Sequence, residues 1–186
     1  EMTAYTGLVT LVQLSACILG DKNRMSYDAG ISYIKNVLEA TKTLLKNPND
    51  LDTRSIIMMG ASLSTSSRLG IGKEEAYAYD IYELEFLPEK LFGSSYRRSL
   101  TSIFPRFLEA MGKRHKEDVR KYYLDVFGFD SSIEESSRKL VALFSDFGVD
   151  MYYDGIINRE QVGCIPCDTE LDENEIFEMI NGLIRK

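Results

Sequence analysis

The sequence predicts an all-α protein, a bundle of several helices. Apolar residues recur at spacings of three and four along most of the chain, which is the period of an amphipathic helix. No segment shows a sustained alternation of apolar and polar residues between turns, as a half-buried strand would. Prolines and glycines lie at the ends of the periodic segments, where helices stop. With 186 residues and no internal repeat or linker, the chain is expected to form a single helical domain, residues 1–186.

The first predicted helix, residues 7–20, reads GLVTLVQLSACILG and is apolar on nearly all sides. It is too short to span a bilayer, so we expect a helix buried in the core. The second helix covers residues 31–45 and stops before Pro48. Its stripe consists of Ile31, Ile34, Val37, Leu38, Thr41, Leu44 and Leu45. A third helix starts near Asp52 and fades into a flexible turn of small polar residues at 62–72. Its apolar residues are Ile56, Ile57, Met59 and Leu63.

Two prolines mark the middle of the chain. Residues 76–86, AYAYDIYELEF, look helical, and this segment is expected to end at Pro88. A further helix is expected near residues 96–111, with a kink or break at Pro105 because proline removes a backbone donor inside the helix.

Three more helices are predicted after residue 115. Residues 116–128 and 132–148, KEDVRKYYLDVFG and SIEESSRKLVALFSDFG, are amphipathic, and each ends in a glycine suited to the left-handed C-terminal position. The last helix covers residues 172–185 and is entered through Thr169 and Asp172, which have the spacing of a capping box.

The composition narrows the class of protein. The chain has 29 acidic residues against 22 Lys and Arg, a net charge of −7, which argues against a general nucleic-acid binder. Its three cysteines cannot all pair internally, and no signal peptide or membrane span is visible. We therefore expect a cytoplasmic protein that binds neither nucleic acid nor membrane. Residues 97–121 are rich in Lys and Arg, which predicts a solvated helix face, with an anion or partner site as the alternative.

Cys164 and Cys167 form a CxxC pair. We favour a structural or incidental role for this pair over a redox dithiol or half of a zinc site. A zinc site needs two further donors, and the chain offers only the distant Cys17 and His115. His115 lies in a charged turn and is expected to be exposed to solvent. Because it is the one histidine, a histidine-rich metal site and a Ser-His-Asp triad elsewhere in the chain are excluded.

Asp80 and Glu83 lie three residues apart and share a helix face. Such a pair can bind a hard cation, although two acids on a surface helix are more often simply hydrated. Neither G-x-G-x-x-G nor G-x-x-x-x-G-K-[ST] occurs, so the chain has no recognisable phosphate-binding loop.

Taken in order, the segments resemble the C-terminal helical domain of the iron-containing alcohol dehydrogenases over nearly the whole chain. LLKNPNDLDTRSIIMMGAS resembles that family's helix, Asn-Pro turn and arginine-led helix, with Arg54 at the arginine. AYAYDIYELEF resembles D-W-A-x-H-x-x-x-H-E-L, with Glu85 at the glutamate. YRRSLTSIFPRFLEAM resembles H-G-x-x-L-A-I-x-x-P through Leu100, Ile103 and Pro105. VFGFD, FSDFGVDMYYDGI and GCIPCDTELDENEI resemble the family's later segments.

The resemblance implies enzymes of twice this length, whose other half is a Rossmann-like domain that holds NAD(P). Their iron or zinc lies between the halves on one aspartate and three histidines, and it polarises the alcohol oxygen for hydride transfer. Residues 5–20 contain neither Asp nor His, so the first two ligands have no counterpart. Histidine positions of the family fall on Asp80, Leu84 and Tyr96. The resemblance therefore implies a dismantled metal site, with no metal or cofactor held by this chain.

Arg97 and Arg98 stand at the start of a predicted helix, where the helix dipole disfavours cations. One hypothesis is that Arg97 or Arg98 approaches Asp80, so that a guanidinium replaces the metal as the cation between two helices. The alternative is that both arginines are simply hydrated.

Three functions are considered. The first is a degenerate family member without the catalytic metal, a pseudoenzyme acting as an interaction or scaffold domain, with a Rossmann-like domain or a second copy as its partner. The second is half of an NAD(P)-dependent alcohol or aldehyde oxidoreductase whose nucleotide-binding domain is missing from this chain, with Tyr96 as a candidate acid. A small carboxylate metal module on Asp80 and Glu83 is a third. Glu1 stands before Met2, which is consistent with the chain being part of a longer protein.

Overall fold

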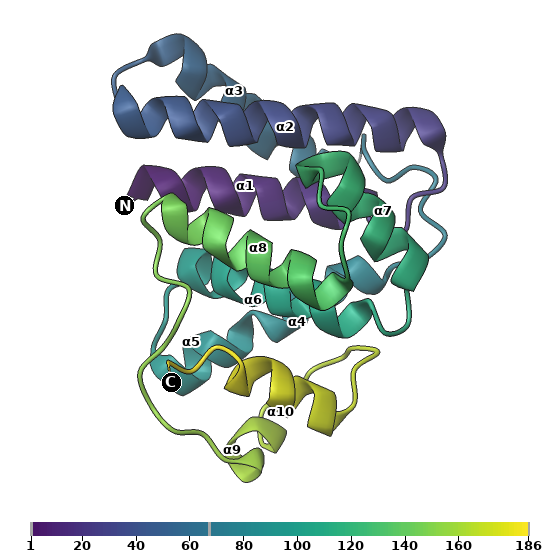
Figure 1. Ribbon diagram of the computed structural model, residues 1–186, viewed down its shortest axis with the longest axis vertical. Helices are drawn as coiled ribbons and strands as arrows, with labels where there is room; N and C mark the ends of the chain where they lie inside the picture. Colours follow the sequence, from purple (N-terminus) through teal and green to yellow (C-terminus); the bar gives the residue numbers. More distant parts are fainter. Residues whose placement is uncertain (1, 67, 186) are drawn as a thin grey trace.

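The regular structure of this chain is helical. The computed structural model describes residues 2–66 and 68–185, so Ser67, within the predicted turn, and the two end residues lie outside it. The described residues form helices and two isolated β-bridges, and they contain no strand (Figure 1). The predicted all-α class is confirmed.

The helices follow the order of the predicted segments. They are α1 (Met2–Ile18), α2 (Arg24–Lys46), α3 (Leu51–Ser64), the 3₁₀ helix η1 (Tyr77–Asp80), α4 (Ile81–Leu84), α5 (Phe86–Phe92), α6 (Tyr96–Met111), α7 (Lys116–Phe127), α8 (Ile133–Asp146), α9 (Arg159–Gly163) and α10 (Glu173–Asn181).

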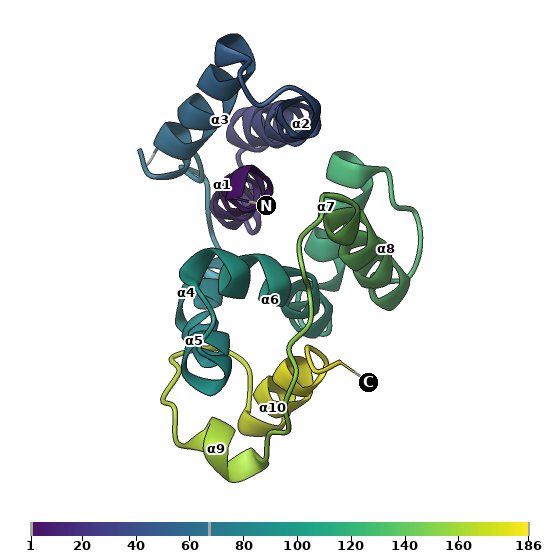
Figure 2. The same ribbon diagram turned by 90° about the vertical axis from the view of Figure 1, so that its left-hand side faces the viewer.

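α1 lies at the centre of the molecule because it is apolar on nearly every side. α2 and α3 cover it on one side and α6 on the opposite side (Figure 2). Two glycines let α1 and α2 approach closely. A Cβ on Gly7 would overlap the side chain of Thr41, and a Cβ on Gly30 would overlap Ile18. The buried core helix predicted for residues 7–20 is confirmed.

α2 and α3 form a hairpin around the Asn-Pro turn. α2 is capped by the Asn23 side chain and ends at Lys46, before Pro48 as predicted. In α3 the predicted apolar residues do not all face the core. Ile57 is buried, whereas Ile56 and Met59 are 39% and 62% exposed. The buried residues of α3 are Ile57 and Gly60, and a Cβ on Gly60 would overlap the side chain of Val37, so α3 meets the core along a narrow strip.

Residues 76–86 do not form one helix, and the helical segment does not end at Pro88. The chain passes through η1 and α4, and then α5 runs across Pro88. Pro88 is the third residue of α5, in the first turn, where a backbone N–H has no partner within the helix. α6 is likewise continuous through Pro105, so the predicted break does not occur. The Pro105 carbonyl accepts a hydrogen bond from the Ser137 hydroxyl of α8, at 2.9 Å.

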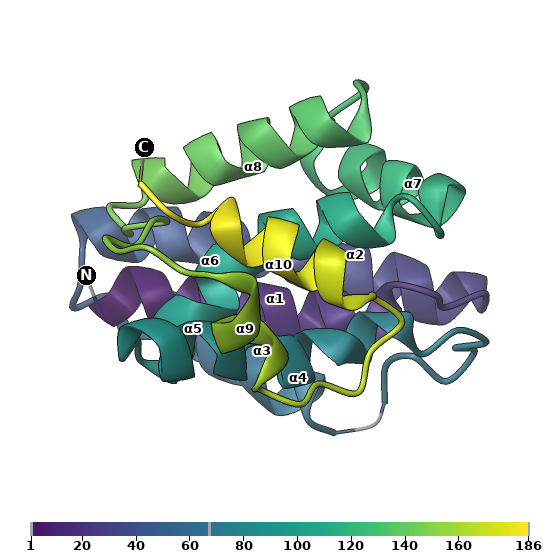
Figure 3. The same cartoon turned by 90° about the horizontal axis from the view of Figure 1, so that it is seen from below.

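The helices of the last third pack on α5 and α6 from different sides: α8 lies against α6 and α7, α9 against α5, and α10 against α6. α7 and α8 are followed by left-handed glycines, Gly128 and Gly148, with φ of 71° and 78°, as predicted. α10 is shorter than predicted, and its capping box joins Asp172 to Glu175 instead of Thr169 to Asp172. α10 packs against α6 and α9 (Figure 3). No helix in the described part of the chain has both the length and the apolar character needed to cross a membrane.

Candidate functional site

A chain of neutral hydrogen bonds joins three helices beside Tyr96. The Gln13 side-chain amide of α1 donates to the Tyr96 phenol at the start of α6, at 3.3 Å. The Ser64 hydroxyl at the end of α3 donates to the carbonyl oxygen of the same Gln13, also at 3.3 Å. Sequence reasoning singled out Tyr96 but missed Gln13 and Ser64. Gln13 is the one side-chain amide in the apolar residues 7–20, and that was the available signal.

The other two former histidine positions have different surroundings. Leu84 is fully buried in the hydrophobic core. Asp80 accepts two hydrogen bonds through one carboxylate oxygen, from the Thr169 hydroxyl and from the Glu170 N–H, both at 2.8 Å. Asp80 therefore anchors the connection between α9 and α10. Among the described residues, no group of three or more His, Cys, Asp and Glu has an arrangement that could hold a metal ion, which includes any group built on Asp80 and Glu83.

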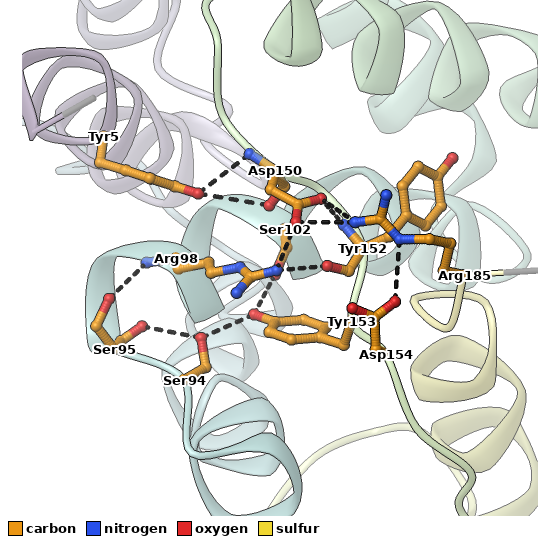
Figure 4. Close-up of polar contacts among 10 residues, drawn as sticks. All are labelled: Tyr5, Ser94, Ser95, Arg98, Ser102, Asp150, Tyr152, Tyr153, Asp154 and Arg185. Carbon is orange, nitrogen blue, oxygen red and sulfur yellow. Dashed lines mark hydrogen bonds and ion pairs between the residues drawn. The ribbon is translucent and has the colours of Figure 1, made fainter.

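The expected contact between an N-terminal arginine of α6 and Asp80 is wrong. Arg98 donates to the Asp150 carboxylate at 3.0 Å and to the Tyr152 carbonyl, and its guanidinium lies over the Tyr153 ring at 4.5 Å (Figure 4). Within the described residues, no ion pair links Arg97 or Arg98 to Asp80 or Glu83. The physical reason is that the connection between α8 and α9 passes beside the start of α6, and Asp150 supplies the compensating negative charge there.

The cluster around Asp150 fixes the end of the chain. Arg185 donates twice to the Asp150 carboxylate, at 2.9 and 3.1 Å (Figure 4). The Tyr153 hydroxyl lies 2.9 Å from both the Ser94 and the Ser102 hydroxyl. Asp150 thus connects α6 with the C-terminal residues, and each charge of this cluster has a partner of opposite sign.

His115 is not exposed, contrary to expectation. Its side chain is 15% exposed, and its ring is stacked on that of Tyr77, with centroids 3.9 Å apart and planes 6° apart. Nδ1 lies 2.9 Å from a Glu75 carboxylate oxygen and Nε2 lies 2.8 Å from one of Glu170. Sequence reasoning failed here because both carboxylates lie far from His115 along the chain.

Cys17 and Cys167 have the features of unreactive thiols, whereas Cys164 is exposed. All three are free. Burial raises the pKa of Cys17, and burial together with the nearby charge of Glu83 raises the pKa of Cys167. A reactive thiol needs the opposite shift. In the described structure, no strand or helix of the thioredoxin arrangement flanks the CxxC pair: α9 ends just before Cys164, and α10 begins several residues after Cys167.

Lys73 and Glu85 have the perturbed acid–base behaviour that functional groups often show. Burial lowers the pKa of Lys73 to about 8. Its ammonium donates to the Ala16 carbonyl at the end of α1 and lies 3.8 Å from the centre of the Tyr79 ring, a position suited to a helix C-terminus. Glu85 is only 3% exposed, and one of its oxygens is buried without a hydrogen-bond partner. Burial and the charge of Glu89 raise its pKa to about 7.

Comparison with known proteins identifies the fold. No family model and no curated protein matches the sequence. NADH-dependent butanol dehydrogenase A from Thermotoga maritima is similar in structure, with a TM-score of 0.81 at 12% identity over 98% of this chain and 52% of that one. An aldehyde reductase from E. coli has a TM-score of 0.70 at 15% identity over 81% of this chain and 41% of that one. An iron-containing alcohol dehydrogenase from Corynebacterium glutamicum has a TM-score of 0.65 at 15% identity over 99% of this chain and 52% of that one.

This chain therefore spans about half the length of the solved structures it matches. The resemblance of the sequence to the helical half of the iron-containing alcohol dehydrogenases is confirmed at the level of the fold.

Proposed function

We propose that this chain is a helical interaction or scaffold domain with the iron-containing alcohol dehydrogenase fold, in which the metal-dependent chemistry has been lost. The observation that carries the proposal is the hydrogen-bonded chain from Ser64 through Gln13 to Tyr96. It occupies the place where α1 and the start of α6 face each other. The partner that suits such a domain is a Rossmann-like domain or a second copy of this chain.

The donor set does not fit iron or zinc. Both ions are held in proteins by imidazole, thiolate and carboxylate groups. An amide, an aliphatic hydroxyl and a phenol stand at this place, and they already satisfy one another. Leu84 has no atom that could ligate a metal. One carboxylate oxygen of Asp80 already accepts hydrogen bonds from the Thr169 hydroxyl and the Glu170 N–H.

Metal analysis of the purified protein tests the proposal. We expect iron and zinc far below one ion per chain, and no rise in Tm when either is added. The matched control is the double variant Gln13→His, Tyr96→His, which places two imidazoles where the amide and phenol now touch. We expect this variant to gain a zinc-dependent rise in Tm. Stoichiometric iron or zinc in the wild type would overturn the proposal.

The half-length match favours a second candidate, an NAD(P)-dependent alcohol or aldehyde oxidoreductase whose nucleotide-binding half is a separate domain. In that protein the Tyr96 phenol, which is 39% exposed, is the candidate acid. Two measurements test it. The first is an NADH titration of the full-length gene product. The second compares the alcohol dehydrogenase activity of Tyr96→Phe with that of the control variant Tyr79→Phe. Tight NADH binding and loss of activity in Tyr96→Phe alone would support this candidate. Absence of NADH binding would exclude it.

A further inference from the structure

His115 and Asp80 hold the same stretch of chain, residues 164–171, here called the cysteine segment. Asp80 receives the Thr169 hydroxyl and the Glu170 N–H. The Glu170 carboxylate reaches back to His115 in the turn between α6 and α7. The cysteine segment is thus attached to η1 at one point and to the α6–α7 turn at another.

The bonding of His115 depends on its protonation. A neutral imidazole has one N–H and one lone pair, whereas the imidazolium has two N–H groups. The two ring nitrogens face the carboxylates of Glu75 and Glu170, which are acceptors only. Only the protonated ring therefore donates to both. Turning the ring toward another acceptor would break its stack with Tyr77.

Within the described part of the chain, no other cation takes the place of the imidazolium between these two carboxylates. The charged or titratable groups that face the ring or flank it in the sequence are Glu75, Tyr77, Asp118, Glu170, Arg114 and Lys116. Asp118 accepts a hydrogen bond from the hydroxyl of Tyr77, the residue stacked on the His115 ring, at 2.5 Å. Arg114 donates to both oxygens of Glu175, at 2.8 and 2.6 Å, and is occupied there.

We propose that His115 is a proton-operated latch for the cysteine segment. While the ring is protonated, it bonds Glu75 and Glu170 together and the segment lies on η1. When the ring loses its proton, one carboxylate faces a nitrogen lone pair, and a charge-assisted hydrogen bond becomes a repulsion. The segment is then released as the pH rises. Release frees the Asp80 carboxylate and exposes Cys167, whose thiol otherwise points to the Glu83 carbonyl.

The single histidine makes the latch directly measurable, because its ring gives one unambiguous NMR signal. The Glu170 amide reports on the segment, since it is bonded to Asp80. We expect its protection from hydrogen exchange, corrected for the intrinsic pH dependence of exchange, to fall about tenfold along the pH curve of the ring signal. The Glu135 amide, bonded to the Ser132 hydroxyl at the start of α8, is the internal control and should not change.

Two variants separate a latch from a purely structural contact. In His115→Gln the Glu170 amide should be weakly protected at every pH, because the side chain never carries a charge. In Glu170→Gln the ring still titrates, and protection should no longer follow it. Constant Glu170 protection while the wild-type ring titrates would overturn the proposal, as would the wild-type pH dependence persisting in either variant.

Discussion

At the residue scale, Glu85 is the group most at odds with its surroundings. Its buried carboxyl has a pKa raised to about 7, and one oxygen lacks a partner. A carboxyl whose pKa is raised on folding binds its proton more tightly in the folded state. The free energy of unfolding should therefore fall as the pH rises from the ordinary value of 4.5 through about 7, and remain lower above it.

We predict that Glu85→Gln removes this loss. The amide is nearly the same shape as the protonated acid and carries no charge at any pH. Between pH 5 and pH 8.5 the wild type should lose on the order of 2 kcal/mol more stability than Glu85→Gln, measured by urea unfolding. Glu74→Gln, at an exposed position, is the control and should keep the wild-type slope. An unchanged slope in Glu85→Gln would show that the carboxyl is ionised in the folded state.

The candidate site was only partly predictable from residues alone. Resemblance located Tyr96 because a family motif surrounds it, and Leu84 and Asp80 followed by position. The resemblance did not identify the residues that bond to Tyr96, because Gln13 and Ser64 come from helices whose relative placement depends on packing. The His115 contacts were missed for the same reason, since charged turns are usually exposed and its partners lie in distant loops.

At the element scale, the approach of α1 to α2 depends on glycine. We predict that Gly7→Ala destabilises the protein by about 1–3 kcal/mol, because the new methyl group would overlap the Thr41 side chain. The cost should be smaller in a Thr41→Ala background, where most of the overlapping atoms are gone. A double-mutant cycle of urea unfolding energies measures this coupling.

Gly163→Ala provides the matched control for this prediction. Gly163 also lies in a helix, but no atom lies within 4 Å of the place that an alanine methyl group would take there. At this position the better helix propensity of alanine should leave stability unchanged or slightly improved. If Gly7→Ala also left the stability unchanged, the close approach of α1 and α2 would not depend on this glycine.

Most helices could be predicted because periodicity and stop signals are local. The ends of α7 and α8 needed only a glycine that adopts a left-handed conformation. The segment 76–86 was mispredicted because periodicity does not distinguish a 3₁₀ turn from an α-helix, and because a proline in the first turn does not stop a helix. The exposed face of α3 was mispredicted because its packing depends on a close approach at Gly60, which a hydrophobic stripe does not reveal.

At the scale of the whole molecule, the C-terminal residues are joined to the rest by few elements. The backbone of Tyr153 pairs with residues on either side of Ile184, accepting from the Arg185 N–H and donating to the Leu183 carbonyl. Asp150 adds ion pairs to Arg98 and Arg185. The last residues are therefore held by the ion pairs of Arg185 with Asp150 and Asp154, by the buried Leu183 side chain and by one short backbone pairing with Tyr153.

We predict that Asp150→Asn weakens this attachment by about 1–2 kcal/mol in the free energy of unfolding, because it removes two ion pairs that are only partly exposed. Part of the loss should disappear at 1 M salt, where the wild-type pairs are screened. Asp28→Asn removes only the solvent-exposed pair with Arg24, one turn apart on α2, and should cost almost nothing. Equal effects of the two substitutions would mean that Asp150 acts as an ordinary surface charge and that the other contacts of the C-terminal residues hold them in place.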